Sequence, residues 1–321
     1  MPNPRSILCA LLLGVTMPSS CPVSGQDYPT KPIRIVTSQP GSSNDLVARL
    51  IAQAGLSTSL GQPVIVDNRG IVAAEIAREA AADGYTILSY GSPLWISPLV
   101  RKVPWDAVKD FAPITLTVDT PNLLVVHPSV PVKSVQELIA LAKARPGKLD
   151  YGSSSTGATP HLAAELFKAM AGVNIVRIPY RGSGPALNAL VGGQVQLMFP
   201  NAGAAAPHVK SGRVRALAVT TARPSALAPG LPTMAASGLP GYESSSPLGI
   251  FAPAKTPAAI VNRLQREIVK TLNREDVKER LFVSGVEVVG SSPEQLENRL
   301  KSEIARWGKL IKEADIREQG K

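Results

Sequence analysis

The stretch Ile33–Ile51, IRIVTSQPGSSNDLVARLI, decides the fold. Its apolar start predicts a strand, Pro40-Gly41 predicts a turn, and the apolar residues of its second half recur at helical spacing. Ser43 or Asn44 can cap this helix, and Asp45 in its first turn suits its positive end. The expected product is a loop at the carboxyl end of a strand, lined by free backbone N–H groups and hydroxyls. Such a loop attracts an anion without a charged side chain.

The stretch Leu149–Leu162, LDYGSSSTGATPHL, repeats this design. It predicts a strand, a glycine loop rich in hydroxyls, and then a helix. Thr159 is the expected N-cap, and Pro160 stands at the first helical position, where its missing N–H costs nothing. Two such loops in one chain indicate a single anion site that is held from both sides.

Composition excludes some classes of function. The chain has 321 residues, of which 44% are hydrophobic, so it can form one large or two medium domains with a full core. Aromatic residues are only 4%, and the basic residues behind the net charge of +10 are scattered. We therefore expect no nucleic-acid partner, because both the stacking surface and the polyanion footprint are missing. A basic field can still gather anionic ligands.

Residues 1–25 are typical of an export signal peptide. Arg5 provides the positive start, Ile7–Val15 the short apolar core, and Val23–Gly25 a cleavage site of small residues. Both cysteines, Cys9 and Cys21, lie in this segment. Cleavage after Gly25 would leave a mature chain without cysteine, which is compatible with an oxidising compartment because no thiol remains to be oxidised.

A rival interpretation makes Cys21 a lipid-modified N-terminus. Pro18 stands where such a signal expects an aliphatic residue, so the match is poor. No other apolar run of the chain approaches about 20 residues, the length that a membrane-spanning helix needs. We expect a soluble protein after export.

Strand and helix patterns alternate along the chain, which predicts parallel sheets with helices on both faces, an α/β fold. The pattern occurs twice. We expect one lobe from residues 26–126 and 248–321 and a second from residues 127–247. Two strands, near Leu123–Val126 and Leu248–Phe251, would cross between the lobes. Open α/β sheets bind ligands beyond the carboxyl ends of their strands, so two such edges would face each other across a cleft that hinge bending closes.

A series of short motifs runs through nearly the whole mature chain. In chain order they include Pro40-Gly41-x-x-x-Asp45-x-x-Ala48-Arg49, Asp83-Gly84-Tyr85-Thr86, Pro104-Trp105-Asp106, Pro179-Tyr180-Arg181-Gly182 and Gly193-Gln194-Val195-Gln196-Leu197-Met198-Phe199. With these motifs the chain resembles the solute receptors of tripartite tricarboxylate transporters, also called Bug or TctC-like periplasmic binding proteins.

The resemblance implies a type II periplasmic binding protein fold, with two Rossmann-like lobes around a ligand cleft. It also implies an extracytoplasmic receptor for a small organic anion, a carboxylate or dicarboxylate, which passes its ligand to a separate membrane permease. The family typically holds the carboxylate with backbone amides and hydroxyls of two facing loops. We expect a monomer, no cofactor and no metal.

The chain departs from the family pattern in several places, among them the glycine-rich stretch after Arg69, which is shortened to Gly70–Val72. Ser42 replaces the second glycine of the first loop, and Gln39 stands near a position that is usually aromatic. Pro200 stands where many members carry an acidic residue after the strand that ends in Met-Phe. The last departure weakens the case for a ligand that carries an amine.

The candidate ligand-binding residues belong to the two loops and to the loops after neighbouring strands. They are Gln39, Gly41, Ser42, Ser43, Asp45, Ser92, Ser153, Ser154, Ser155, Thr156, Thr159, His161, Tyr180 and Asn201. Structural alternatives stand beside these assignments: a simple capped turn for the first loop, packing for His161, and a cover over the cleft for Tyr180.

Enzyme signatures are absent from the sequence. It contains no Gly-x-Ser-x-Gly, Walker A or His-Glu-x-x-His motif, and its three histidines are too far apart in sequence to form a metal-ligand motif. We expect no enzyme. Two alternatives to the transport receptor stay open: a receptor that presents its ligand to a sensor protein, and a secreted hydrolase built on a Ser155–His161 pair.

Overall fold

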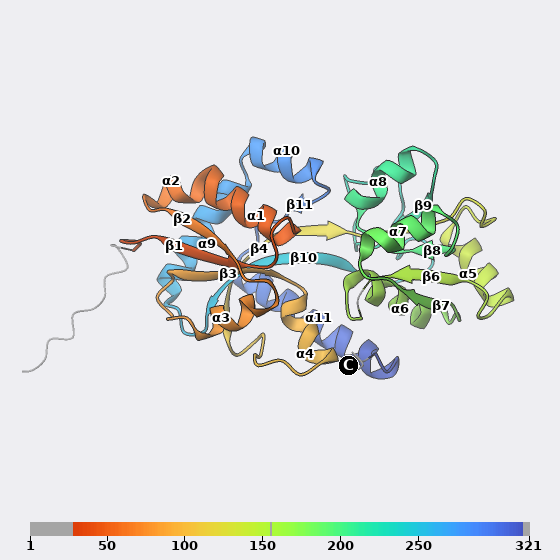
Figure 1. Cartoon of the computed structure of the whole chain (residues 1–321), viewed down its shortest axis with the longest axis horizontal. Coiled ribbons are helices and arrows are strands. Elements are labelled where there is room, and N and C mark those ends of the chain that lie inside the picture. Colours follow the sequence, from red (N-terminus) through yellow and green to blue (C-terminus); the bar gives the residue numbers. More distant parts are fainter. Residues whose placement is uncertain (1–27, 155, 317–321) are drawn as a thin grey trace, which may run out of the picture.

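The computed structural model describes residues 28–154 and 156–316, so the expected signal peptide and Ser155 lie outside the described residues. The chain forms two α/β lobes that lie side by side, joined by long strands that run through the middle of the molecule (Figure 1). The α/β fold and the two-lobed architecture are therefore confirmed.

The first lobe is built on a six-stranded sheet of order β11-β4-β10-β3-β1-β2. β1 pairs in parallel with β2 and β3, whereas β10 lies antiparallel between β3 and β4. The strands are β1 Ile33–Thr37, β2 Val64–Asn68, β3 Thr86–Gly91, β4 Phe111–Pro121, β10 Ser245–Pro253 and β11 Glu287–Val288.

The second lobe has a five-stranded sheet of order β7-β6-β8-β5-β9, in which β6 is parallel to β7 and β8 and β5 is antiparallel to β8 and β9. Its strands are β5 Leu123–Val126, β6 Asp150–Ser153, β7 Val176–Pro179, β8 Leu197–Met198 and β9 Arg215–Val219. Its helices are α5 Val135–Ala144, α6 Thr159–Ala171, α7 Ser183–Val191 and α8 Ala202–Lys210.

The first lobe carries the remaining helices. They are α1 Ser43–Ile51, α2 Ser57–Leu60, α3 Ala73–Glu79, α4 Pro93–Val100, α9 Ala258–Leu272, α10 Glu275–Val283 and α11 Pro293–Glu313, with a π-helical turn at Ala52–Leu56 and a 3-10 turn at Gly70–Val72. α11 begins with a full capping box between Ser292 and Gln295, and Pro293 occupies its first position. This long helix lies against α4 and β4 of the first lobe and α6 of the second.

The chain crosses between the lobes next to the two apolar runs that were expected to cross, and the runs themselves lie inside the two sheets. β4 ends at Pro121 and β5 begins at Leu123, so the chain passes between the lobes at Asn122. Leu248–Phe251 lies inside the first sheet, and the return crossing comes just before it, where Ser244 donates its backbone N–H to Thr220 O at 2.8 Å. β4 contains Pro113 and Pro121, which hide it as a strand in the sequence.

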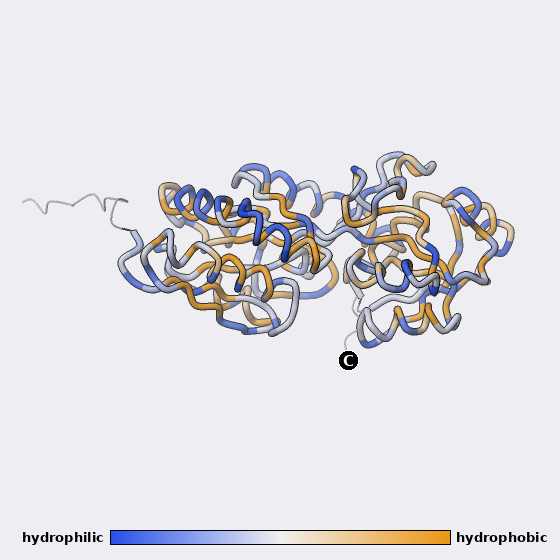
Figure 2. Tube along the Cα trace, turned by 90° about the horizontal axis from the view of Figure 1, so that it is seen from above, coloured by the Kyte–Doolittle hydropathy of each residue, from blue (hydrophilic) through white to orange (hydrophobic). Residues whose placement is uncertain are grey.

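The apolar core is continuous across the two lobes. One cluster of buried side chains runs from Leu88 and Phe251 in the first sheet, past Trp307 of α11, to Leu124 and Phe167 in the second lobe. Apolar residues gather inside both lobes, with polar residues toward the outside (Figure 2). The lobes are thus joined by shared packing as well as by the crossing chain.

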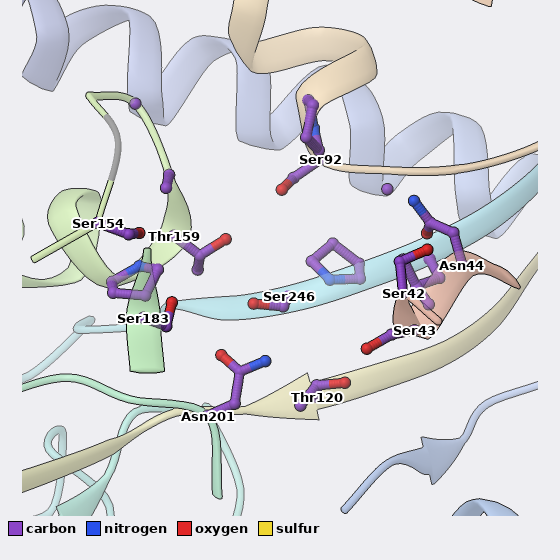
Figure 3. Close-up of a pocket in the computed structure, with 17 residues that line it drawn as sticks. Ser42, Ser43, Asn44, Ser92, Thr120, Ser154, Thr159, Ser183, Asn201 and Ser246 are labelled. Atoms are coloured by element: carbon purple, nitrogen blue, oxygen red, sulfur yellow. The ribbon is translucent and has the colours of Figure 1, made fainter. Parts of the chain in front are cut away.

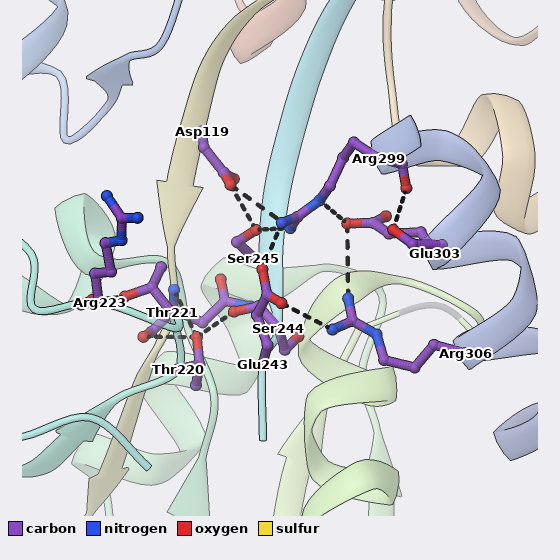
Figure 4. Close-up of polar contacts among 12 residues, drawn as sticks. Asp119, Thr220, Thr221, Arg223, Glu243, Ser244, Ser245, Arg299, Glu303 and Arg306 are labelled. Carbon is purple, nitrogen blue, oxygen red and sulfur yellow. Dashed lines mark hydrogen bonds and ion pairs between the residues drawn. The ribbon is translucent and has the colours of Figure 1, made fainter. Parts of the chain in front are cut away.

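A polar cluster ties α11 to both crossing segments (Figure 4). Arg299 of α11 donates to Glu303 Oε1 at 2.7 Å and to Ser245 Oγ at 2.9 Å, pairs with Glu243, and lies 3.8 Å from Asp119 Oδ2. Ser245 Oγ in turn donates to Asp119 Oδ2 at 2.7 Å. Since Asp119 is on β4 and Ser245 on β10, the guanidinium group links the hinge strands to the helix that spans them.

Burial raises the pKa of Asp119 to about 7, although the positive charge of Arg299 acts in the opposite direction. Folding therefore favours the protonated form of Asp119 compared with the unfolded chain. The contribution of this group to stability is complete below its unfolded pKa of about 4 and is lost as the pH rises through about 7.

We predict that Asp119→Asn flattens the pH dependence of the free energy of unfolding between about pH 4 and about pH 7, because asparagine cannot ionise. Urea unfolding across this range measures the effect. Asp83→Asn, at a surface ion pair with Lys31, is the control and should keep the wild-type slope. An Asp119→Asn protein that keeps the wild-type slope would contradict the assignment.

Candidate functional site

A cavity of about 300 Å³ lies between the lobes, with the hinge strands as part of its wall (Figure 3). Side chains of the first lobe and the second lobe face each other across it, and Thr120, Ser246 and Asn201 lie between the two groups. The cavity is lined by Ser42, Ser43, Asn44, Gly91, Ser92, Pro93, Thr120, Ser154, Gly157, Ala158, Thr159, Pro160, Ser183, Asn201, Ser246, Pro247 and Leu248.

Five helices begin at this cavity. α1 and α4 come from the first lobe, and α6, α7 and α8 come from the second. Their first residues or caps form the lining at Ser42–Asn44, Ser92–Pro93, Ala158–Pro160, Ser183 and Asn201. Each helix start presents unpaired N–H groups and the positive end of the helix dipole. None of the lining residues is charged, so the donors that the wall itself offers an anion are backbone N–H groups and side-chain hydroxyl and amide groups.

The turn of the first loop is fixed by Asp45. Gly41, at φ +76°, donates its N–H to Asp45 Oδ2 at 2.9 Å, and Asn68 Nδ2 donates to Asp45 Oδ1 at 2.9 Å. Burial opposes ionisation, but these hydrogen bonds and the Arg49 guanidinium together lower the pKa of Asp45. The carboxylate is thus committed to the loop itself, and Asp45 shapes the cavity wall without lining it.

The caps of α1 complete this wall. Ser42 Oγ accepts from the Asp45 N–H at 3.2 Å and donates to Gln39 O at 2.7 Å. Asn44 Nδ2 donates to Ser38 Oγ at 3.0 Å, while Asn44 Oδ1 is buried without a partner among the described residues. Ser43 carries no such bond to the loop, and its hydroxyl faces the cavity (Figure 3).

Arg177 of β7 holds the second loop from behind. Its guanidinium donates to Ser153 Oγ at 2.7 Å, to Thr156 Oγ1 at 3.1 Å and to Ser154 O at 2.9 Å. Ser154 then lies in the cavity wall, whereas Ser153 and Thr156 do not. The positive charge of Arg177 stands directly behind the loop and adds to the attraction for an anion.

His161 supports the same loop from the first turn of α6. Burial, followed by the charge of Arg177, lowers the pKa of His161 to about 4, so the imidazole is neutral at physiological pH. Its Nδ1 accepts the Gly157 N–H at 3.1 Å, and its Nε2 lies 4.0 Å from Glu165 Oε1. His161 is buried behind the cavity lining, so it positions the loop.

The structure gathers some of the predicted site residues at the cavity and places others behind it. Those that line the cavity are Ser42, Ser43, Ser92, Ser154, Thr159 and Asn201. Those that support it through hydrogen bonds are Gly41, Asp45, Ser153, Thr156 and His161. Gln39 is exposed and Tyr180 packs against the second-lobe core. Ser155 lies outside the described residues, and ligand contact by any of these side chains stays a prediction.

Sequence reasoning missed several lining residues for identifiable reasons. Thr120 and Ser246 lie on paired crossing strands, and only the β4–β10 pairing brings them together. Ser183 opens α7 after Tyr180-Arg181-Gly182, so the rule that helix starts face the site could have found it. Leu248 and Pro247 supply an apolar part of the wall that no motif announces.

Neither a membrane span nor a metal centre is found in the part of the chain that the structure describes. None of the helices in residues 28–154 and 156–316 combines the length and the apolar character needed to cross a bilayer. Over the same residues, His, Cys, Asp and Glu side chains form no group of three or more that could hold a metal ion.

Two α/β lobes around a cleft of helix starts define a solute-binding protein of the two-lobed periplasmic type. Residues 47–316 match the tripartite tricarboxylate transporter family receptor, TctC. The chain belongs to this family, whose members are periplasmic solute receptors, and the resemblance seen in the sequence is confirmed.

Relatives cover the chain almost end to end. Protein BugT of Bordetella pertussis is 37% identical over 302 residues, which is 92% of either chain. Among solved structures, R. palustris Rpa4515 with adipate is 39% identical with a TM-score of 0.75, covering 91% of this chain and 99% of that one. MatC from Rhodopseudomonas palustris with bound malate is 29% identical with a TM-score of 0.70, covering 88% and 100%.

We predict that Arg177→Gln loosens the second loop, because it removes a charged donor that binds the loop three times. Losing hydrogen bonds from a charged group costs about 1.5–3 kcal/mol, which corresponds to amide exchange at residues 153–157 that is faster by about tenfold or more. Hydrogen exchange measured by mass spectrometry tests this. Arg213→Gln, at an exposed arginine, is the control, and equal protection in both variants would contradict the role.

Proposed function

We propose that this protein is a periplasmic receptor that binds a small dicarboxylate in the cleft and delivers it to a tripartite tricarboxylate-type permease. The observation that carries the proposal is the convergence of five helix starts, from both lobes, on one cavity without charged lining residues. Each helix end stabilises a nearby anion by about 0.3–2 kcal/mol, and closure of the cleft removes competing water.

The distribution of donors favours two negative groups over one. Helix starts stand on both sides of the cavity, two in the first lobe and three in the second, so each lobe can hold one carboxylate. The apolar wall at Pro247 and Leu248 suits the hydrocarbon between them. Adipate and malate, named with the two related structures, are both dicarboxylates, which supports the proposal for this chain.

An amine on the ligand would find no negatively charged partner in this cavity, because the lining includes no carboxylate. The absence of a carboxylate from the lining agrees with the position of Pro200, which stands where many members of the family carry an acidic residue. The hydrolase alternative gains no support from His161, since its Nδ1 accepts a backbone N–H and its Nε2 faces Glu165.

We predict micromolar binding of at least one unbranched or hydroxylated dicarboxylate in a calorimetric panel that runs from malonate to suberate. The corresponding dimethyl esters and diamines should not bind, because helix N-termini favour negative charge. Monocarboxylates of the same length should bind more weakly. A panel without any saturable dicarboxylate binder would contradict the proposed ligand class.

We also predict that Ser43→Ala and Ser154→Ala each weaken binding of the best dicarboxylate, one from either lobe. Loss of one hydrogen bond to a charged ligand costs about 1.5–3 kcal/mol, so affinity should fall about tenfold or more. Ser302→Ala, at an exposed position of α11, is the control and should bind as the wild type does. Wild-type affinity in both site variants would remove these hydroxyls from the site.

A further inference from the structure

The two lobes also meet at a backbone contact beside the hinge, between Gly203 and Gly285. Gly203 is the second residue of α8, and Gly285 forms the turn between α10 and β11. A Cβ atom on Gly203 would lie 2.9 Å from Gly285 Cα and 3.1 Å from Ser284 O, where ordinary contact begins at 3.4 Å. A side chain on Gly203 therefore requires the two backbones to separate by half an ångström or more.

A second tie lies on the same edge of the lobes. Glu287 of β11 accepts from Ser225 Oγ at 2.7 Å and from the Ala226 N–H at 2.9 Å. Ser225 and Ala226 follow β9, so they belong to the second lobe, whereas β11 belongs to the first sheet. The glycine contact and this carboxylate together fix how closely the lobes approach.

This contact is one flank of the cavity. Asn201, which lines the cavity, caps α8 two residues before Gly203. On the other lobe, Glu287 pairs with Asp119, the neighbour of the lining residue Thr120. Asn201 is bridged to Asn122 of the crossing chain, so a separation at Gly203 turns the lobes about this crossing and widens the cavity between the two sets of helix starts.

We propose that Gly203 determines the length of ligand that the receptor accepts, because its missing side chain sets the spacing between the lobes. This inference rests on the proposed function, in which a dicarboxylate reaches from one lobe to the other. With a methyl group at position 203, the best wild-type ligand no longer spans the cleft in its closed form. A homologue longer by one methylene spans the widened cleft instead.

The test is Gly203→Ala, with Gly184→Ala as a matched control. Both glycines are the second residue of a helix that starts at the cavity, but a Cβ on Gly184 has no atom within 4 Å. Alanine is a better helix former than glycine, so neither substitution should unfold its helix. Calorimetry with unbranched dicarboxylates of increasing length gives the affinity profile of each protein.

We expect Gly203→Ala to shift the ratio of affinities toward the longer homologue by about tenfold or more, the usual effect of one methylene in a binding site. Gly184→Ala should keep the wild-type profile. A Gly203→Ala protein with the wild-type length preference overturns the inference, while binding by the wild type leaves the proposed function intact.

Crystal structures of the ligand-free wild type and Gly203→Ala provide a readout that needs no ligand. We expect residues 203 and 285 to lie farther apart in the variant, with the lobes rotated about the hinge. An unchanged lobe placement overturns the inference. If the wild type binds no dicarboxylate, the proposed function fails, and this comparison still decides whether Gly203 sets the spacing.

Discussion

The structure depends on positive helix ends that face one another across a cleft. A helix start cannot satisfy its first N–H groups internally, so it accepts an anion or water there. Because five helices start around one cavity, their unsatisfied N–H groups dominate the chemistry of the site. Two charged side chains hold the loops in place through hydrogen bonds: Asp45 accepts from the first loop, and Arg177 donates to the second.

Opposed helix ends repel each other electrostatically when the cleft is empty, so other contacts must hold the lobes. The continuous apolar core and the Arg299 cluster at the hinge supply them. Because the polar cluster links β4, β10 and α11, it constrains the strands about which the lobes turn. The Gly203–Gly285 contact then limits how far closure can go. In the proposed function, these few places would couple ligand binding to the relative position of the lobes.

Much of this arrangement could be predicted from local sequence. The Ile33–Ile51 pattern of strand, turn and helix appears as β1 and α1, and the Leu149–Leu162 pattern appears as β6 and α6. Local rules succeed for these elements because turn residues act over a few positions. The predicted caps were wrong by one or two residues: Ser42, not Ser43 or Asn44, caps α1, and Ala158, not Thr159, precedes α6. Local rules could not place Thr120 and Ser246 at the cavity, because these residues meet only through strand pairing. They could not predict the hydrogen bonds of Arg177 either, because it reaches the second loop from a neighbouring strand. β4 was hidden by its two prolines, which sit at its ends or at register shifts.

The central claim is that helix starts of both lobes hold the two ends of an anionic ligand. A crystal structure with the best-bound dicarboxylate tests it most directly. We expect one carboxylate to accept backbone N–H and hydroxyl hydrogen bonds at the start of α1 or α4, and the other at the start of α6, α7 or α8. A ligand whose carboxylates are held by arginine or lysine side chains, or that lies outside this cavity, would contradict the account.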